Sequence, residues 1–357
     1  LSLHDALPIL NKFNEEIHST LVKCRKFDKL YNSSVLIIGA SGMIGSCLVD
    51  VFMQLNKLYD ADIKVYAMAR NGAYLRSRFS NYIPNSNFKI LEHDICNEID
   101  MNLDVDYIIH GGSNADPAMI SNNPVDTITS NFIGMNNLLK YYTSNNVKRL
   151  LYISSGEMYG LLDEKNTSFS EDYVGYLDYS SPRTSYPSGK RATEVLCQSY
   201  ISQYDADIVI ARPCHIYGPT MKENDSRAIC QFIRSGSKGK DIVLKSDGLL
   251  ERSHCYVIDS ATALLYILAF GENGEAYNIS DRKSQCTIKE LAEKIAEVSS
   301  VDIKFEIPTQ NEKASFSKVN KAVLSSEKLE MLEWSAVTNL EDGIEKTINH
   351  LKFDLNS

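Results

Sequence analysis

The sequence lacks the features that define several protein classes. No apolar run approaches the roughly 18 residues that a helix needs to cross a bilayer. None of the eight cysteines forms a C-x-x-C pair, and we find no secretory signal peptide. These absences argue against a disulfide framework and a zinc site. They favour free thiols in a reducing cytoplasm, and we expect a cytoplasmic protein.

Basic residues are also fewer than acidic ones. The chain of 357 residues has 37 Lys and Arg against 46 Asp and Glu, a net charge of -9. This balance argues against a nucleic-acid surface and a polybasic membrane patch, so we expect neither partner, and we predict no metal site. The length suits one large domain or two interleaved ones.

The richest stretch is 35–45, Val-Leu-Ile-Ile-Gly-Ala-Ser-Gly-Met-Ile-Gly. Its aliphatic start predicts a buried parallel strand, and an amphipathic helix is expected over about 44–55. Gly39 permits a tight turn, Gly42 lets a pyrophosphate approach the backbone, and Gly45 allows close packing of helix on strand. The helix N-terminus offers free N–H groups to phosphates. We interpret this turn as a dinucleotide site; the alternative is a turn with incidental glycines. The predicted cofactor-binding residues here are Gly39, Ser41, Gly42, Met43, Ile44 and Gly45.

Strand and helix patterns then alternate along the chain. Further strands are predicted over 62–69, 88–91, 105–110, 149–154 and 208–212, and long helices over 124–145 and 185–204. This order predicts an α/β fold with a Rossmann-type doubly wound parallel sheet, whose ligands lie beyond the carboxyl ends of the strands. The pattern becomes irregular after residue 213, which suits a smaller C-terminal substrate-binding part. We therefore expect an NAD(P)-binding domain over 35–212, and over 213–357 a mainly substrate-binding part interleaved with it.

Residues 1–34 form an N-terminal extension. Residues 1–9 have no clear periodicity and resemble a cloning or assembly scar, so they are left out of the fold prediction. Residues 11–31 have helical spacing, with Phe13, Ile17, Leu21 and Val22 on one face. We interpret this segment as a helix that packs on the main domain.

Tyr186 and Lys190 begin the helix over 185–204. The i, i+4 spacing puts the phenol and the ammonium on one face. A nearby cation favours the phenolate, so we expect Lys190 to lower the pKa of Tyr186 and make it usable as a base. Ser154 and Ser155 end the preceding strand, where a hydroxyl can reach the same reacting oxygen. The alternative is a solvated helix face.

These residues resemble the extended short-chain dehydrogenases/reductases that modify nucleotide sugars, the NAD-dependent epimerase/dehydratase family. The resemblance runs from Val35 to about Ile348. Its motifs are Gly39/Gly42/Gly45, 93–95, 154–160, Tyr186/Lys190, 211–219, 252–259 and 275–278.

The resemblance implies a shared first step. Tyr186 would remove the proton of the sugar C4 hydroxyl while the C4 hydride passes to NAD. Lys190 would hold the ribose and tune Tyr186, and Ser155 would bind the C4 oxygen. Asp94 and Ile95 would face the adenine. We also expect a nucleotide-diphosphate sugar as substrate and a homodimer.

The second step depends on 155–157. Dehydratases of this family usually have Thr-Asp-Glu there, and the Asp protonates the departing C6 hydroxyl. This chain has Gly156 at that position and keeps Glu157. A C4 ketone makes a C6 carboxylate a β-keto acid, which loses carbon dioxide without such an acid. Together with 212–225, this resembles the UDP-glucuronate decarboxylases, which form UDP-xylose. A 4,6-dehydratase and a 4-epimerase remain alternatives, as does a catalytically silent NAD(P)-sensing protein.

Several positions depart from the decarboxylase pattern. Those enzymes have Asn where His215 stands, and a Pro-rich loop where this chain has 113–117, which includes Asn114. We expect Asn114 and His215 to contact the substrate, and Arg227 and Arg252 to meet its diphosphate. The alternatives are a loop histidine bound by backbone at 215 and a carboxylate that only orders the loop at Glu157. Structural roles are expected for His110, Tyr256 and Asp259.

Arg70 bears on the choice of cofactor. Many relatives end the second strand with Asp, which binds the ribose 2′-hydroxyl of NAD. An Arg could instead pair with the 2′-phosphate of NADP. We expect NAD on family habit, with NADP as the alternative and Arg70 as a cofactor-binding residue.

Overall fold

A seven-stranded parallel sheet forms the centre of the computed structural model, which describes residues 3–101, 103–309 and 321–356. The strand order is β11-β6-β5-β4-β1-β2-β3. Every pair in this sheet is parallel. The strands are β1 (Ser34–Ile38), β2 (Lys64–Ala69), β3 (Phe88–Glu92), β4 (Tyr107–His110), β5 (Arg149–Ile153), β6 (Ile208–Pro213) and β11 (Ala276–Ile279).

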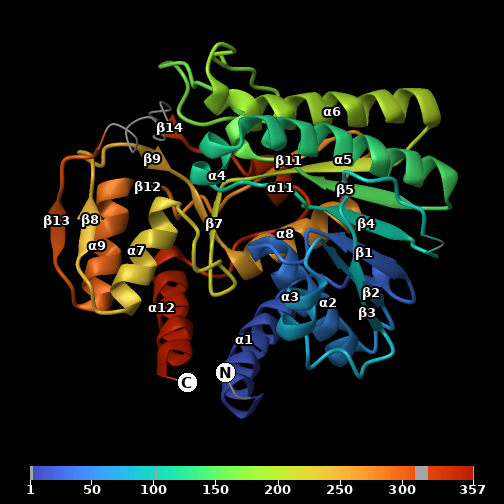
Figure 1. Cartoon of the computed structure of the whole chain (residues 1–357), viewed down its shortest axis with the longest axis horizontal. Coiled ribbons are helices and arrows are strands. Elements are labelled where there is room, and N and C mark those ends of the chain that lie inside the picture. The colour runs from blue at the N-terminus through green and yellow to red at the C-terminus, as the bar shows by residue number, and fades with distance from the viewer. Residues whose placement is uncertain (1–2, 102, 310–320, 357) are drawn as a thin grey trace.

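Helices cover both faces of the sheet, because the strands bury side chains on both sides. In β1, Val35 and Ile37 belong to one apolar cluster, whereas Leu36 and Ile38 belong to the other. In Figure 1, α5 and α6 lie above the sheet, and α1, α2 and α8 lie below it. The helices of this part are α1 (Leu3–Leu21), α2 (Met43–Tyr59), α3 (Gly72–Arg78), α4 (Pro117–Asn122), α5 (Pro124–Ser144), α6 (Ser185–Tyr204) and α8 (Val257–Phe270). The predicted doubly wound α/β fold is confirmed.

Two elements of the sheet layers come from the irregular C-terminal region. The edge strand β11 pairs with β6, and the almost wholly buried α8 packs against α2. Neither was predicted as part of the sheet. The four residues of β11 give too short a pattern, and α8 is apolar all round, so it has no amphipathic period.

The N-terminal helix is longer than expected. It begins at Leu3, so residues 3–9, which the prediction left out, form part of a helix; residues 1 and 2 lie outside the described residues. Phe13, Ile17 and Leu21 are buried as predicted, whereas Val22 follows the helix end and is 53% exposed. The helix packs on α2, α8 and α12.

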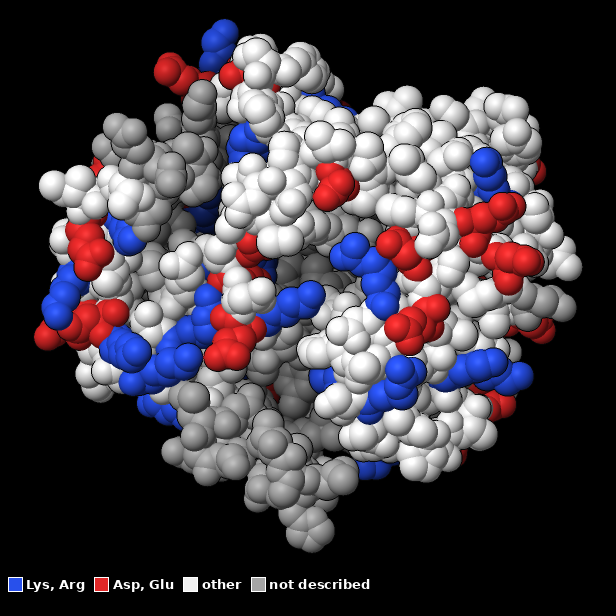
Figure 2. All heavy atoms as spheres, in the orientation of Figure 1, with Lys and Arg blue, Asp and Glu red and all other residues white. Residues whose placement is uncertain are grey.

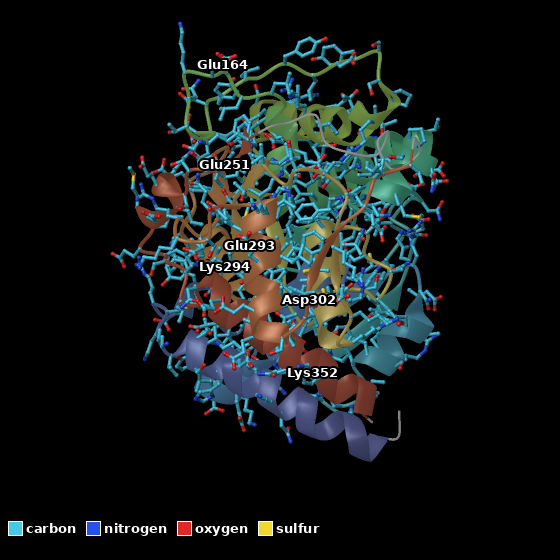
Figure 3. The ribbon with its side chains drawn as sticks, turned by 90° about the vertical axis from the view of Figure 1, so that its left-hand side faces the viewer. Glu164, Glu251, Glu293, Lys294, Asp302 and Lys352 are labelled. Atoms are coloured by element: carbon cyan, nitrogen blue, oxygen red, sulfur yellow. The ribbon has the colours of Figure 1, made fainter. Side chains whose placement is uncertain are left out.

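The remaining C-terminal elements form a smaller lobe beside the carboxyl ends of the strands, at the left of Figure 1. A view onto this lobe shows α9 and α12, with Glu293, Lys294 and Lys352 labelled on them (Figure 3). Its elements are β7 (His215–Tyr217), α7 (Ala228–Ser237), β8 (Ile242–Leu244), β9 (Glu251–Arg252), β10 (His254–Tyr256), β12 (Cys286–Thr287), α9 (Ile288–Ser299), β13 (Ile303–Phe305), β14 (Lys321–Ala322) and α12 (Leu340–Asn356). The short helix α11 (Glu327–Glu330) instead packs against the edge strand β11 of the sheet. Three 3₁₀ turns, η1 (Asp28–Leu30), η2 (Gly156–Tyr159) and η3 (Pro182–Thr184), lie in connecting loops.

Candidate active site

The glycine turn joins β1 to α2 through tight backbone packing. Gly39 has φ +87°, and a Cβ there would lie 2.7 Å from the Gly112 nitrogen. A Cβ on Gly45 would lie 2.3 Å from the Gly39 carbonyl oxygen. Gly42 differs, because a Cβ there would meet only that same oxygen, at 3.3 Å. Gly39 and Gly45 are therefore needed by the fold, while the space beside Gly42 is open to a ligand.

The first turn of α2 has unused hydrogen-bond donors. Gly42 is its N-cap and offers no side chain, and the first turn has no acidic residue. Ser41, Met43 and Ile44 are partly buried around this end of the helix. Unpaired N–H groups and the positive end of the helix dipole suit a pyrophosphate. The residues present therefore fit a dinucleotide.

The other predicted cofactor residues follow the neighbouring strands. Arg70 directly follows β2 and is exposed. Asp94 follows β3, and its side chain accepts a 3.0 Å hydrogen bond from the Cys96 nitrogen. Ile95 is 7% exposed, and its side chain lies against Gly134 of α5. These three residues lie on adjacent strands, β2 and β3, at the edge where the glycine turn follows β1.

Tyr186, Lys190 and Ser155 come together beyond β5. Tyr186 is 4% exposed, and the Lys190 Nζ lies 5.7 Å from the centre of its ring. The Ser155 side chain lies close enough to the Tyr186 hydroxyl to act on the pKa of the phenol, which it lowers. Lys190 donates a 2.9 Å hydrogen bond to the Ile153 carbonyl oxygen. Of the four predicted catalytic residues, these three lie in one region, where Tyr186 and Lys190 are buried and Ser155 is partly buried.

The electrostatics of this group contradict one prediction. Burial and the negative charge of Glu157 raise the pKa of Tyr186, although Ser155 and two arginines oppose them. Lys190 does not lower it, because burial lowers the pKa of Lys190 itself to about 7 and its ammonium binds the Ile153 carbonyl. In the protein without cofactor or substrate, Tyr186 is therefore the neutral phenol.

Glu157 lies at the open side of the group. It accepts a 3.1 Å hydrogen bond from Arg183, and its side chain is 39% exposed. The charge of Glu157 also acts on Arg252, whose pKa burial lowers to about 10. Arg252 itself is 5% exposed. The carboxylate thus pairs with Arg183 and acts through its charge on Tyr186 and Arg252.

The C-terminal lobe brings His215 and Arg227 to the same region. Burial lowers the pKa of His215 well below its usual value, with the charges of Arg252, His254 and Arg227 adding to the effect. Its buried Nδ1 has no hydrogen-bond partner in the part of the chain that the structure describes. The Arg227 guanidinium acts on Tyr186 electrostatically, but it already pairs with Asp225 at 2.6 Å, a partner that was not predicted. Any diphosphate at Arg227 must share it with that carboxylate.

The loop after β4 forms another side of the candidate active site. Asn114 lies in this loop and is partly buried. Two residues on, Asp116 caps α4 and accepts a 2.7 Å hydrogen bond from the Ser226 nitrogen next to Arg227. The contact ties the loop to the C-terminal lobe. On the face shown in Figure 2, Lys and Arg side chains gather beside a hollow near the centre of the molecule.

Several buried polar atoms in the segments that carry the site have no hydrogen-bond partner among the described residues. Polar ligands such as a ribose, a nicotinamide amide or a sugar could satisfy them. Among the described residues they include His110 Nδ1, Ser113 Oγ, Ser154 Oγ, Arg183 Nε, Ser185 Oγ and His215 Nδ1.

Sequence reasoning missed the residues that hold the η2 turn. Arg191 donates hydrogen bonds to the carbonyl oxygens of Met158, Tyr159 and Gly175, at 2.5–2.9 Å. Arg212 forms a buried pair with Glu194 at 2.6 Å. Arg212 belongs to the 211–219 motif, so its signal was present. Arg191 follows Lys190 directly, and nothing in its spacing indicates three backbone partners.

Tyr256 and Asp259 have the structural roles predicted for them. Tyr256 donates a 3.0 Å hydrogen bond to Glu16 of α1. Asp259 accepts hydrogen bonds from the Val337 and Thr338 nitrogens, and burial raises its pKa to about 6. His110 is likewise buried and stacks on Tyr152, and burial together with the charge of Lys190 lowers its pKa to about 3.

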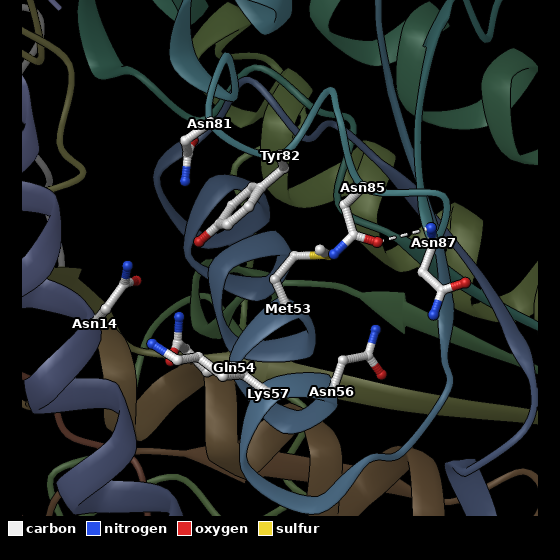
Figure 4. A pocket seen from close by; sticks show the side chains of 9 residues that line it. All are labelled: Asn14, Met53, Gln54, Asn56, Lys57, Asn81, Tyr82, Asn85 and Asn87. Atoms are coloured by element: carbon white, nitrogen blue, oxygen red, sulfur yellow. Dashed lines mark hydrogen bonds between the residues drawn. The ribbon is translucent and has the colours of Figure 1, made fainter.

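A separate cavity of about 490 Å³ lies between α1, α2 and the loop before β3 (Figure 4). Its amides largely serve local structure. Asn56 binds both backbone groups of Ile63, and Asn85 accepts a hydrogen bond from the Asn87 nitrogen. No residue of the predicted site lines it. Within the described ranges, no group of three His, Cys, Asp or Glu could hold a metal, and no helix could cross a membrane.

Known proteins resemble this chain in sequence and in structure. A sequence model of the NAD-dependent epimerase/dehydratase family matches residues 35–280. UDP-glucuronic acid decarboxylase 6 of Arabidopsis thaliana is 30% identical over 313 residues, 88% of this chain and 87% of the relative. UDP-glucuronic acid decarboxylase 1 of Xenopus tropicalis is 29% identical, over 90% of this chain and 72% of the relative.

Two solved structures share the fold. One is UDP-glucose 4-epimerase of Thermotoga maritima with UDP-glucose (TM-score 0.77, 23% identity, 90% of this chain and 99% of that one). The other is the dTDP-glucose 4,6-dehydratase DesIV of Streptomyces venezuelae with NAD bound (TM-score 0.77, 22% identity, 90% and 98%). Given the family match over most of its length, this chain belongs to the NAD-dependent epimerase/dehydratase family and is an NAD-dependent enzyme.

Proposed function

We propose that this enzyme decarboxylates UDP-glucuronate to UDP-xylose through a bound 4-keto intermediate. NAD, when bound, takes the hydride from C4 of the sugar and later returns it. Tyr186 removes the proton of the C4 hydroxyl, and Ser155 holds the same oxygen. Lys190 binds the ribose and adds positive charge near the phenol. Burial excludes water from Tyr186 and Lys190 and strengthens their interactions with the partly buried Ser155.

The observation that carries the choice of reaction is the lack of an acid at Gly156. A hydroxyl at C6 leaves only after protonation, whereas carbon dioxide leaves a β-keto acid unaided. The carboxylate next in the turn, Glu157, is paired with Arg183. The relatives named above support the same choice, since both are UDP-glucuronic acid decarboxylases and align over most of this chain.

Substrate recognition is proposed for residues of three segments. The 113–117 loop contributes Asn114, β7 contributes His215, and Arg227 and Arg252 provide positive charge for the diphosphate. The unpaired Nδ1 of His215 supports this assignment, because a neutral imidazole can accept a hydrogen bond from a substrate hydroxyl. The division into a cofactor-binding part over 35–212 and a mainly substrate-binding part over 213–357 is likewise a proposal.

We further propose that two copies associate through α5 and α6. These helices pack against each other and leave apolar side chains on their outer surface. Val125 is 69% exposed, Phe132 is 42% exposed and Val195 is 66% exposed. Exposed apolar groups on adjacent helices favour a protein interface.

A panel of nucleotide sugars separates the candidate reactions. The purified enzyme is incubated with UDP-glucuronate, UDP-glucose or dTDP-glucose, and the masses of the products are measured by mass spectrometry. Loss of carbon dioxide from UDP-glucuronate supports the proposal. Loss of water from a hexose nucleotide favours a 4,6-dehydratase, and an unchanged mass with altered retention favours a 4-epimerase. A silent NAD(P)-sensing protein would change none of them and would give no nicotinamide absorbance.

A further inference from the structure

Leu324, which reaches the site from the far end of the chain, fills the space beside Gly156. A Cβ on Gly156 would lie 3.0 Å from Leu324 Cδ1, 3.2 Å from its Cδ2 and 3.4 Å from the Pro213 carbonyl oxygen. Leu324 is 4% exposed. Its isobutyl group therefore occupies the room into which a side chain at position 156 would project.

The position of Leu324 is fixed by its backbone. Its nitrogen donates a 2.8 Å hydrogen bond to the Ser253 hydroxyl, and its carbonyl oxygen accepts one of 2.8 Å from the Ser280 hydroxyl. Both serines are buried. The side chain clusters with Tyr159 and Phe169, whose rings stack at 4.9 Å. An apolar group held on all sides in this way cannot easily move aside.

Gly156 directly follows Ser155, whose side chain acts on the Tyr186 hydroxyl. If these two hydroxyls hold the C4 oxygen, a substituent on a carbon next to C4 comes within reach of position 156. The side of position 156 that faces Leu324 is apolar, because Met158 and Cys214 also pack against the Leu324 cluster.

We propose that Leu324 is a specificity-determining residue that commits the 4-keto intermediate to decarboxylation; this inference rests on the proposed function. In that step the C5–C6 bond breaks, its electron pair moves onto the C4 oxygen as an enolate, and carbon dioxide departs. One proton from solvent then adds to C5. The negative charge spreads from a carboxylate to a larger anion, so apolar surroundings disfavour the starting carboxylate more than the dispersed charge.

The inference is tested by separating C4 oxidation from carbon dioxide release. Leu324→Asn replaces the wall with an amide of similar size that can hydrogen bond the carboxylate. We expect carbon dioxide release from UDP-glucuronate to fall at least tenfold, while the first-turnover rise in reduced nicotinamide stays within threefold. Leu324→Met is the matched control, because it keeps the volume and the apolar character. It should retain release within threefold.

A second variant guards against misfolding. Leu324→Ala adds no polar group but lets water reach the space beside Gly156. It should also slow carbon dioxide release more than C4 oxidation, by a smaller factor than Leu324→Asn. Gly156→Asp alone should not speed release, since the step delivers no proton to a departing hydroxyl. Two results would overturn this inference and leave the decarboxylase proposal intact. One is carbon dioxide release as fast in both Leu324→Asn and Leu324→Ala as in the unchanged enzyme. The other is an equal fall in C4 oxidation and in carbon dioxide release. Absence of carbon dioxide with the unchanged enzyme overturns the decarboxylase proposal itself, and this inference with it.

Discussion

Tyr186 and Lys190 lie four residues apart on α6, yet their polar groups meet different partners. The Ser155 side chain acts on the phenol, and the ammonium donates a hydrogen bond to the Ile153 carbonyl oxygen. Spacing alone predicted that the two would share a face, which is right, and that the cation would lower the phenol pKa, which is wrong. The prediction did not include burial, which disfavours both the Tyr186 phenolate and the Lys190 ammonium. A charged ligand in the site would change that balance.

Replacing Tyr186 by Phe should abolish turnover and leave the fold intact. It removes one hydroxyl from a buried ring, and groups that act in acid–base catalysis contribute about 10²–10⁴-fold in rate. Turnover of UDP-glucuronate and the melting temperature are the measurements. Tyr204→Phe, at the other end of α6, is the control and should have no effect. Full activity of Tyr186→Phe would refute the oxidative mechanism.

Arg70→Ala should weaken NADP more than NAD. Arg70 is exposed at the end of β2, where it can pair with a 2′-phosphate that NAD lacks. A hydrogen-bonded charge is worth about 1.5–3 kcal/mol, which corresponds to roughly 10–150-fold in Kd. Titrations of both dinucleotides give the ratio, with Arg76→Ala as an exposed control. Equal changes for the two cofactors would make Arg70 a bystander.

At the scale of the elements, strong patterns predicted most of the sheet. The strands β1 to β6 and the helices α5 and α6 lie within two or three residues of the predicted bounds. The misses follow from physics that a single period does not encode. The helix α8 is apolar on all sides, and β11 gains its place only by pairing with β6.

Some residues of the candidate active site could likewise be predicted from the sequence, and others could not. Residues at the ends of predicted strands, such as Gly39 and Ser155, could be placed from the sequence. Leu324 and Arg191 could not, because their contacts join segments that are far apart along the chain or involve backbone carbonyls. Asp225 was also missed, although it lies two residues from its partner Arg227.

Gly42→Val should prevent the retention of NAD without unfolding the protein. Among the described residues, and apart from its chain neighbours, the one atom within 4 Å of a Cβ there is the Gly39 carbonyl oxygen at 3.3 Å, and the φ of -85° suits any residue. The new side chain would occupy the pyrophosphate's approach to the backbone. Nicotinamide bound to the purified protein and the melting temperature are measured together.

The contrasting variant is Gly45→Ala, whose Cβ would lie 2.3 Å from the same carbonyl oxygen. It should lower the melting temperature, whereas Gly42→Val should not. A Gly42→Val protein that still carries one nicotinamide per chain would mean that the glycine turn has been misread.

At the scale of the whole molecule, the N-terminal helix joins the two parts. Glu16 of α1 accepts hydrogen bonds from Tyr256 at the start of α8 and pairs with His350 of α12 at 2.9 Å. One carboxylate thus ties the sheet layer to the last helix of the chain. This explains why a segment that looked like an extension packs as part of the core.

Glu16→Gln should reduce the free energy of unfolding by about 1–3 kcal/mol at pH 7, the usual loss for a hydrogen-bonded charge. Burial would raise the pKa of Glu16, but His350 and Tyr256 outweigh it and lower the pKa. A lowered carboxyl pKa stabilises above its unfolded value of about 4.3, and the effect is lost as the pH falls through the folded value. The difference between the two proteins should therefore shrink below about pH 4.

Urea unfolding at pH 7 and at acid pH measures this difference. Glu15→Gln, its exposed neighbour on α1, is the control and should match the unchanged protein at both pH values. A gap between Glu16→Gln and the unchanged protein that does not vary with pH would contradict the assigned role of the carboxylate.

The most direct test of the account follows the C6 carbon of the substrate. UDP-glucuronate labelled with carbon-13 at C6 is incubated with the NAD-loaded enzyme, and the gas phase and the nucleotide product are analysed together. We predict labelled carbon dioxide and an unlabelled UDP-pentose in equal amounts. Label that stays in the nucleotide, with a changed sugar configuration or a lost water, would contradict decarboxylation at a site whose acid position is glycine.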